Sequence, residues 1–276
     1  MVDVRFQMAR ELSRGEYFGG LFMLGCGSAF ASLIFHSAEE VGWAVAAFGT
    51  FEISVVIWIS CVLGVTLVLR DRTTSVRAFE IALGAGFIFL ILLPIVRLSW
   101  IAVTGLSLYI LSSTAFTDSR RGALILLAMT VPIFWSPLLF QFFASSILAA
   151  DATLVSLLLD THRSGNLVEF VDHSGQLVIF PPCSSIANVS LAFLCWISLS
   201  QIVSHKKSNY DFLWCLLACA AVVAVNVIRL SILGLSEWHY VTFHNQWSDA
   251  ITNVITLGLI VSVSALGVRR ELFQLI

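Results

Sequence analysis

The sequence predicts an all-α polytopic membrane protein of about eight transmembrane helices, with a small extracytoplasmic helix and a β-hairpin before the sixth span. Of its 276 residues, 58% are hydrophobic and only 12% are charged, which is far more apolar than a soluble domain. The apolar residues recur in separate segments along the whole chain, and positive charges gather between alternate segments. We therefore interpret residues 1–276 as a single integral membrane domain.

Eight apolar segments are candidate spans, because most of them have about the 20 residues that a bilayer core requires. They are Tyr17–Phe35, Ile53–Leu69, Ala78–Val96, Leu98–Phe116, Ala123–Phe143, Ser184–Val203, Phe212–Leu235 and Ala250–Val268.

The positive charges predict the orientation of the spans. With eight spans, twelve of the 15 Lys and Arg residues fall on one side, which the positive-inside rule assigns to the cytoplasm. These are Arg5, Arg10, Arg14, Arg70, Arg72, Arg77, Arg120, Arg121, Lys206, Lys207, Arg269 and Arg270. Both termini are then cytoplasmic, in a multi-pass protein of the cell (inner) membrane. Membrane lipids are expected partners, whereas a net charge of -2 without a basic patch argues against nucleic acid.

The segment from Ser145 to Pro182 is the one long polar connection, and this topology makes residues 145–182 an extracytoplasmic insertion. Its first part, Ile147–Leu159, has apolar residues at helical spacing and predicts an interfacial helix. Residues 166–171 and 176–180 then predict two short strands about a four-residue turn. The hairpin leads directly into Pro181-Pro182-Cys183.

Cys183 differs from the other five cysteines, which lie in apolar runs and indicate neither a disulfide framework nor a metal site. It begins the sixth span at its outer end, beside Ser184. A thiol in the first turn of a helix meets unpaired N–H groups and the positive end of the helix dipole, which favour the thiolate. The alternative is a buried cysteine at the membrane interface.

Arg229 lies inside the seventh span, where a guanidinium is costly unless it faces a cavity and a partner. Asn226 precedes it by three residues and shares its helix face. His239 and His244 follow in the next outer loop. Snorkelling to the headgroups and a structural salt bridge are the alternatives for Arg229.

A thiol, a guanidinium and an imidazole on one membrane face suggest acyl transfer without any cofactor. The thiolate would attack a carbonyl, the imidazole would transfer a proton, and the cation would stabilise the oxyanion. Residues 183–249 are therefore the candidate catalytic region.

Four stretches of the chain resemble the exosortase/archaeosortase family of membrane-embedded cysteine proteases and transpeptidases, in order and spacing. They are Thr161-His-Arg-Ser-Gly-Asn-Leu, Pro182-Cys183-Ser184-Ser185, Asn226-Val-Ile-Arg229-Leu and Phe243-His244-Asn-Gln246. The resemblance covers about residues 150 to 260. The family usually has glycine in place of Ser185, and often glycine after the histidine where this chain has Trp247-Ser248.

The resemblance implies a catalytic triad of Cys183, Arg229 and His244, with Asn226, Ser184 and His239 as supporting residues. It also implies the substrates: exported proteins that end in a short motif, a transmembrane stretch and a basic tail. Cleavage would proceed through a thioester at Cys183, with water or an amine as the acceptor.

Two other classes of function compete with this reading. A transporter would use Glu52, Glu80, Arg97 and Arg229 as intramembrane charges. A non-catalytic subunit of a surface polysaccharide export system would need no reactive residue.

Overall fold

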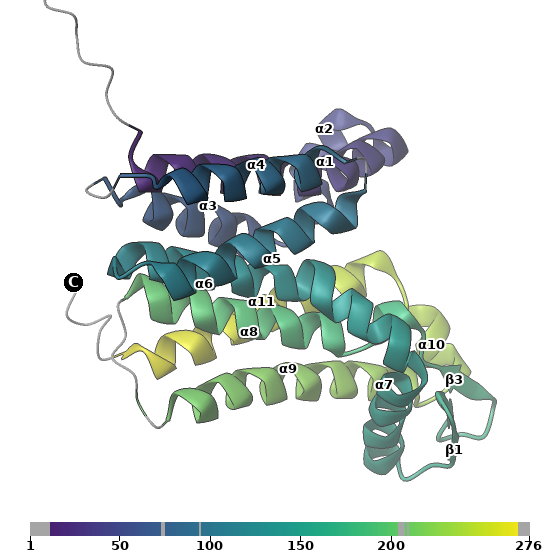
Figure 1. Cartoon of the computed structure of the whole chain (residues 1–276). Coiled ribbons are helices and arrows are strands. Elements are labelled where there is room, and N and C mark those ends of the chain that lie inside the picture. Colours follow the sequence, from purple (N-terminus) through teal and green to yellow (C-terminus); the bar gives the residue numbers. More distant parts are fainter. Residues whose placement is uncertain (1–11, 73–74, 94, 204–207, 209, 270–276) are drawn as a thin grey trace, which may run out of the picture. The chain divides into compact units, whose positions relative to one another are not determined.

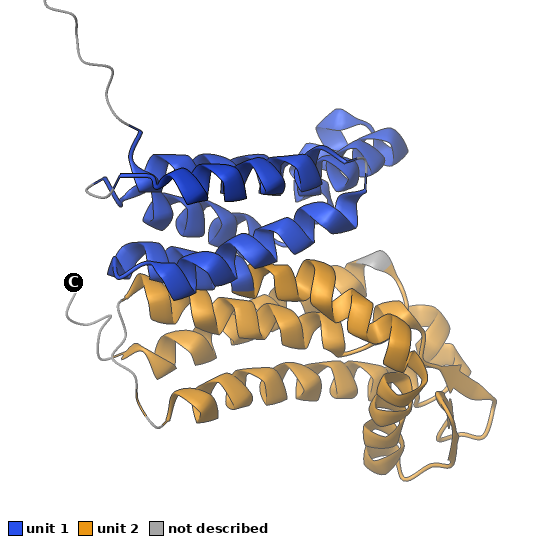
Figure 2. Ribbon diagram, viewed as in Figure 1, with its two compact units in different colours: residues 1–127 blue, residues 128–276 orange. Residues whose placement is uncertain are grey.

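The computed structural model describes residues 12–72, 75–93, 95–203, 208 and 210–269. The chain divides into two compact units, residues 1–127 and 128–276 (Figure 2). The basic residues Arg5, Arg10, Lys206, Lys207 and Arg270, used above to assign the cytoplasmic side, lie outside the described residues.

The first unit consists of helices, labelled in Figure 1. They are α1 (Arg14–Val41), α2 (Trp43–Phe48), the 3-10 turn η1 (Thr50–Glu52), α3 (Val55–Leu69), α4 (Ala78–Leu92), α5 (Val96–Ser113) and most of α6 (Thr117–Thr130). Helix α1 begins where Ser13 and Glu16 form a capping box, and it packs against α3, α4 and α5. The aromatic residues Phe18, Phe22 and Phe30 on α1 are buried, as is Trp100 on α5.

A buried ion pair joins the ends of three helices in this unit. Glu80, in the first turn of α4, is only 1% exposed and accepts a hydrogen bond from Nε of Arg14 at 2.8 Å. The Tyr109 hydroxyl donates to the same carboxylate oxygen at 2.9 Å, and Arg14 also donates to Ser113 Oγ at 2.7 Å. These contacts satisfy both charges and fix α1, α4 and α5 to one another.

The second unit holds the remaining helices and a small sheet. Its elements are η2 (Val131–Trp135), α7 (Ser136–Leu159), β1 (Arg163–Ser164), β2 (Leu167–Glu169), β3 (Gln176–Val178), η3 (Pro181–Cys183), α8 (Ile186–Ile202), α9 (Asp211–Leu233), α10 (Glu237–Phe243) and α11 (Gln246–Gly267). Helices α8, α9 and α11 pack against one another, and α7 packs against α8 and α9.

Helix α7, which precedes the sheet, is longer than the sequence predicted. A span ending at Phe143 and a separate helix starting at Ile147 were predicted, but α7 continues through both. Phe143 has non-helical backbone angles (φ -121°, ψ 18°), which interrupt the helix at that residue. Figure 1 shows that α7 is bent. The π-helical turn η2, with Pro132 inside it, precedes α7 and is a second interruption of regular hydrogen bonding.

The three strands form an antiparallel sheet in the order β1-β2-β3, with Val168 opposite Leu177 across the β2–β3 pair. Gly165, at φ 61°, makes the turn between β1 and β2, where a side chain would be strained. The pairing of β1, only two residues long, was not expected from the sequence.

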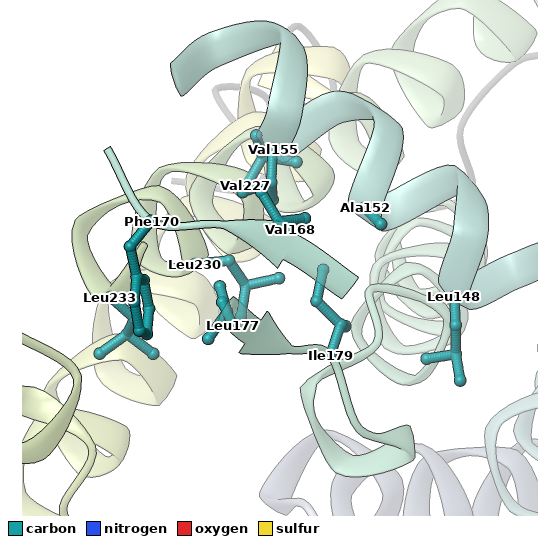
Figure 3. Close-up of a cluster of buried hydrophobic side chains, with 10 residues drawn as sticks. All are labelled: Leu148, Ala152, Val155, Val168, Phe170, Leu177, Ile179, Val227, Leu230 and Leu233. Atoms are coloured by element: carbon teal, nitrogen blue, oxygen red, sulfur yellow. The ribbon is translucent and has the colours of Figure 1, made fainter. Parts of the chain in front are cut away.

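The sheet covers a buried apolar cluster that also includes one side of α7 and of α9 (Figure 3). Its members are Leu148, Ala152, Val155, Val168, Phe170, Leu177, Ile179, Val227, Leu230 and Leu233. Phe140, Leu159, Cys183, Val223 and Tyr240 pack against it. The cluster therefore holds the segment around Cys183 against α9, which carries Asn226 and Arg229.

Within the described part of the chain, five helical segments are long and apolar enough to cross a membrane, consistent with an all-α multi-pass membrane protein. They are Arg14–Val41, Val96–Ser113, Thr117–Leu159, Asp211–Leu233 and Trp247–Gly267. Three further apolar helices, α3, α4 and α8, have 15, 15 and 17 residues. Each of the eight apolar segments in the sequence overlaps one of these eight helices.

Candidate active site

Cys183 is the last residue of the 3-10 turn η3, which precedes α8. Its N–H donates to the carbonyl of Phe180 at 2.9 Å, and the N–H of Ser184 donates to Pro181 at 3.1 Å. The cysteine is half-buried. The sequence predicted this thiol in the first turn of a helix, but α8 begins three residues later, at Ile186.

Asn226 connects α9 directly to the main chain at Cys183. Its side chain is 3% exposed, and Nδ2 donates to the carbonyl oxygen of Cys183 at 2.9 Å. The same Nδ2 donates to Ser185 Oγ at 3.0 Å. The Asn226 side chain therefore ties the main chain at Cys183 to α9.

Asp151 completes this hydrogen-bond network and was not singled out as a site residue from the sequence. The carboxylate, on α7, is 4% exposed and accepts from the N–H of Ser185 at 3.0 Å and from its Oγ at 2.7 Å. A negative charge at the start of α8 is also favourable to the helix dipole. Asp151 is the one charged residue between positions 123 and 159, and that isolation was the available signal.

Ser184 and Ser185 have different surroundings. Ser184 is buried, and its Oγ accepts from the N–H of Ile186 at 3.4 Å, a weak contact at the start of α8. The Ser185 hydroxyl, in contrast, bridges Asp151 and Asn226. The hydroxyl thus joins α7 to α9 through a contact that glycine cannot make.

Arg229 forms an ion pair with Asp249, in the first turn of α11. Its side chain is only 17% exposed, whereas that of Asp249 is 45% exposed. Within the described part of the chain, the buried Nε of Arg229 has no hydrogen-bond partner. The guanidinium is thus paired on one nitrogen and has a free donor on another.

The charges of this ion pair act on the Cys183 thiol. Burial raises the pKa of Cys183, the positive charge of Arg229 lowers it, and the negative charge of Asp249 raises it again. The net shift of the Cys183 pKa is upward. This direction is opposite to the one expected from the helix dipole, because the effect of burial is larger than that of the positive charge of Arg229.

The two candidate histidines lie on and just after α10. His239 Nδ1 is hydrogen-bonded to Ser236 Oγ at 2.7 Å, and its ring stacks on Phe243. His244 follows the last turn of α10, is exposed, and stacks on Tyr240 with ring centroids 5.0 Å apart. Among the described residues, neither imidazole is hydrogen-bonded to Cys183 or Arg229. The structure therefore joins Cys183, Asn226 and Arg229 in one site, whereas the contacts of both histidines are with residues of the α10 segment.

The described residues contain no group of three His, Cys, Asp or Glu side chains that could hold a metal ion. What the site offers is a thiol, a guanidinium with a free donor, and two nearby acids. No family model, curated protein or solved structure matches this chain.

Proposed function

We propose that this chain is a membrane-embedded cysteine protease or transpeptidase of the exosortase/archaeosortase type. The observation that carries the proposal is that Asn226, one turn before Arg229 on α9, is hydrogen-bonded to the main chain of Cys183. A nucleophile and an anion-binding group are thereby held in one site whose ionisable groups interact. The sequence motifs add the resemblance to the family.

Cys183, His244 and Arg229 each have a role in the proposed reaction. The Cys183 thiol gives its proton to the imidazole of His244, and its sulfur attacks the carbonyl carbon of the scissile peptide bond. The oxyanion accepts a hydrogen bond from the free Nε–H of Arg229. The C–N bond then breaks, and the imidazolium returns the proton to the leaving amine. Water or a second amine attacks the resulting thioester and releases the thiol.

A raised pKa of the Cys183 thiol is compatible with this scheme. Because the pKa of Cys183 is raised, the cysteine needs a base to become nucleophilic, which is the role given to His244. The imidazole lies on an exposed segment after α10 and must approach the sulfur when substrate binds. Apo structures often lack catalytic hydrogen bonds that form only in the substrate complex.

The substrates proposed are exported proteins that end in a short motif, a transmembrane stretch and a basic tail. The topology proposed has eight spans and both termini in the cytoplasm, which puts Cys183 on the outer face of the cell membrane. The scissile bond of such a substrate would lie beside its own membrane stretch, near that face. Membrane lipids surround the remaining helices.

The four charged residues that a transporter would use are either already paired or exposed. Glu80 is already paired with Arg14 and Tyr109, and both Glu52 and Arg97 are exposed at helix ends. Arg229 lies in the other unit, paired with Asp249. A non-catalytic subunit of a polysaccharide export system would leave the network around Cys183 without a use.

The proposal is tested by co-expression with a reporter. The reporter is an exported protein from the same source that ends in an apolar stretch and an Arg-rich tail, tagged at both ends. We expect the C-terminal tag to be removed only when this chain is present. An intact reporter, for every candidate with such an ending, would contradict the proposal.

The two histidines are expected to differ in the same assay. His239 is engaged by Ser236, whereas the His244 ring has no hydrogen bond among the described residues and is free to reach the thiol. We expect His244→Ala to stop processing and His239→Ala to reduce it no more than about threefold, since only the first removes the proposed proton carrier. The reverse ranking would move the acid/base role to His239.

A further inference from the structure

Asp249 is the one acidic side chain that pairs with Arg229 among the described residues. It lies in the first turn of α11, where Asn245 caps the helix by accepting from the N–H of Ser248 at 3.0 Å. The carboxylate is therefore anchored by a capped helix rather than by a free loop. Arg229 comes from α9, so the ion pair joins α9 to α11 near Cys183.

The pairing fixes how the guanidinium is presented. Asp249 Oδ1 accepts from one terminal nitrogen, Nη2, and leaves the buried Nε–H without an acceptor in the described part of the chain. A buried donor without a partner is unusual, and it indicates an acceptor that arrives from outside the chain. An arginine side chain without an anchor would sample many rotamers and lose this orientation.

We propose that Asp249 is a positioning residue, which holds the guanidinium of Arg229 beside Cys183 so that Nε–H is presented to the oxyanion of the bound substrate. This inference rests on the proposed function for its catalytic meaning. The ion pair, the buried free donor and the tie from Asn226 to Cys183 carry its geometry.

Four helices packed around the Cys183 segment carry ionisable side chains. Arg229 comes from α9, Asp249 from α11, Asp151 from α7 through Ser185, and Tyr240 from α10 through the apolar cluster. Of the two carboxylates, only Asp249 contributes to the shifted pKa of Cys183, and it raises that pKa. Removal of its charge is therefore expected to make the thiol more acidic and, by releasing Arg229, to make catalysis slower.

These opposite effects give the test. The pH dependence of Cys183 alkylation by a maleimide is measured in full-length chains whose other five cysteines are alanine, and processing of the reporter is measured in parallel. For Asp249→Asn we expect the alkylation midpoint to fall by about half a pH unit, so that alkylation at pH 7 is about threefold faster. Processing is expected to fall at least about tenfold.

Two further variants serve as controls. Glu237→Gln removes the same charge from the first turn of α10, where the side chain is exposed and has no ion pair among the described residues, and it should change neither measurement. Asp249→Glu keeps a carboxylate at the same helix position, so its alkylation midpoint and its reporter processing should stay close to those of the wild-type chain. A merely structural role would instead lower protein recovery, or slow alkylation and processing together.

The proposal is overturned if Asp249→Asn alkylates or processes like the wild-type chain, or if Glu237→Gln has the same effect. It is also overturned if alkylation of Asp249→Asn becomes slower, because the released guanidinium would then no longer face the thiol. If the wild-type chain cleaves no reporter, the proposed function fails. The alkylation comparison still decides whether Asp249 sets the charge at Cys183.

Discussion

Replacement of Cys183 by alanine is expected to abolish reporter processing, by on the order of a thousandfold or more, while the amount of the chain in the membrane stays near normal. The loss is large because no other group in the site can form the thioester. The effect on stability is small because the side chain is half-buried and packs only at the edge of the apolar cluster. Processing and membrane abundance are measured in the same cells by immunoblot.

Two variants sharpen this result. Cys183→Ser should also be inactive, because a hydroxyl has a much higher pKa than a thiol and the site holds no strong base. Cys219→Ala removes another half-buried thiol, on α9, and should process the reporter normally. A Cys183→Ala chain that still processed the reporter would exclude a cysteine mechanism.

Arg229→Lys is expected to reduce processing about a hundredfold, the effect typical of removing an oxyanion donor, with little loss of protein. Lysine keeps the positive charge, but its single ammonium would pair with Asp249, which already accepts from Nη2 of the arginine. No second, rigidly held donor would then replace the buried Nε–H. The rate of reporter cleavage at equal enzyme abundance measures the loss.

Arg97→Lys is the matched control, because it makes the same substitution at an exposed arginine in the first turn of α5. It should leave processing unchanged. Normal processing by Arg229→Lys would mean that the residue only supplies charge, as a snorkelling or structural arginine would.

The helical architecture was accessible from the sequence because apolar runs of membrane length leave few alternatives to helices. The residues at which single helices begin and end were harder to predict. Ser145 and Ser146 follow Phe143 and interrupt the apolar run, so composition suggested an end of the span where the structure has only a bend in α7. The strand β1 is too short for a pattern to identify.

The sequence singled out Cys183, Asn226 and Arg229, but it did not predict the residues with which they pair. Cys183, Asn226 and Arg229 are unusual for their positions in the sequence, and the structure brings them together. Asp249, in contrast, lies 20 residues from Arg229, and only the packing of α11 against α9 makes it the partner. The raised pKa of Cys183 likewise depends on tertiary burial, which the position of a residue relative to a helix start does not report.

The most direct test of the central claim is to look for the covalent intermediate. Purified chain is incubated with a peptide that spans the cleavage site of a processed reporter, quenched in acid and analysed by intact-protein and tryptic mass spectrometry. The proposed mechanism predicts an adduct with the mass of the N-terminal peptide fragment on Cys183, which neutral hydroxylamine removes. Cleavage of the peptide without any adduct on Cys183, or an adduct on another residue, would contradict it.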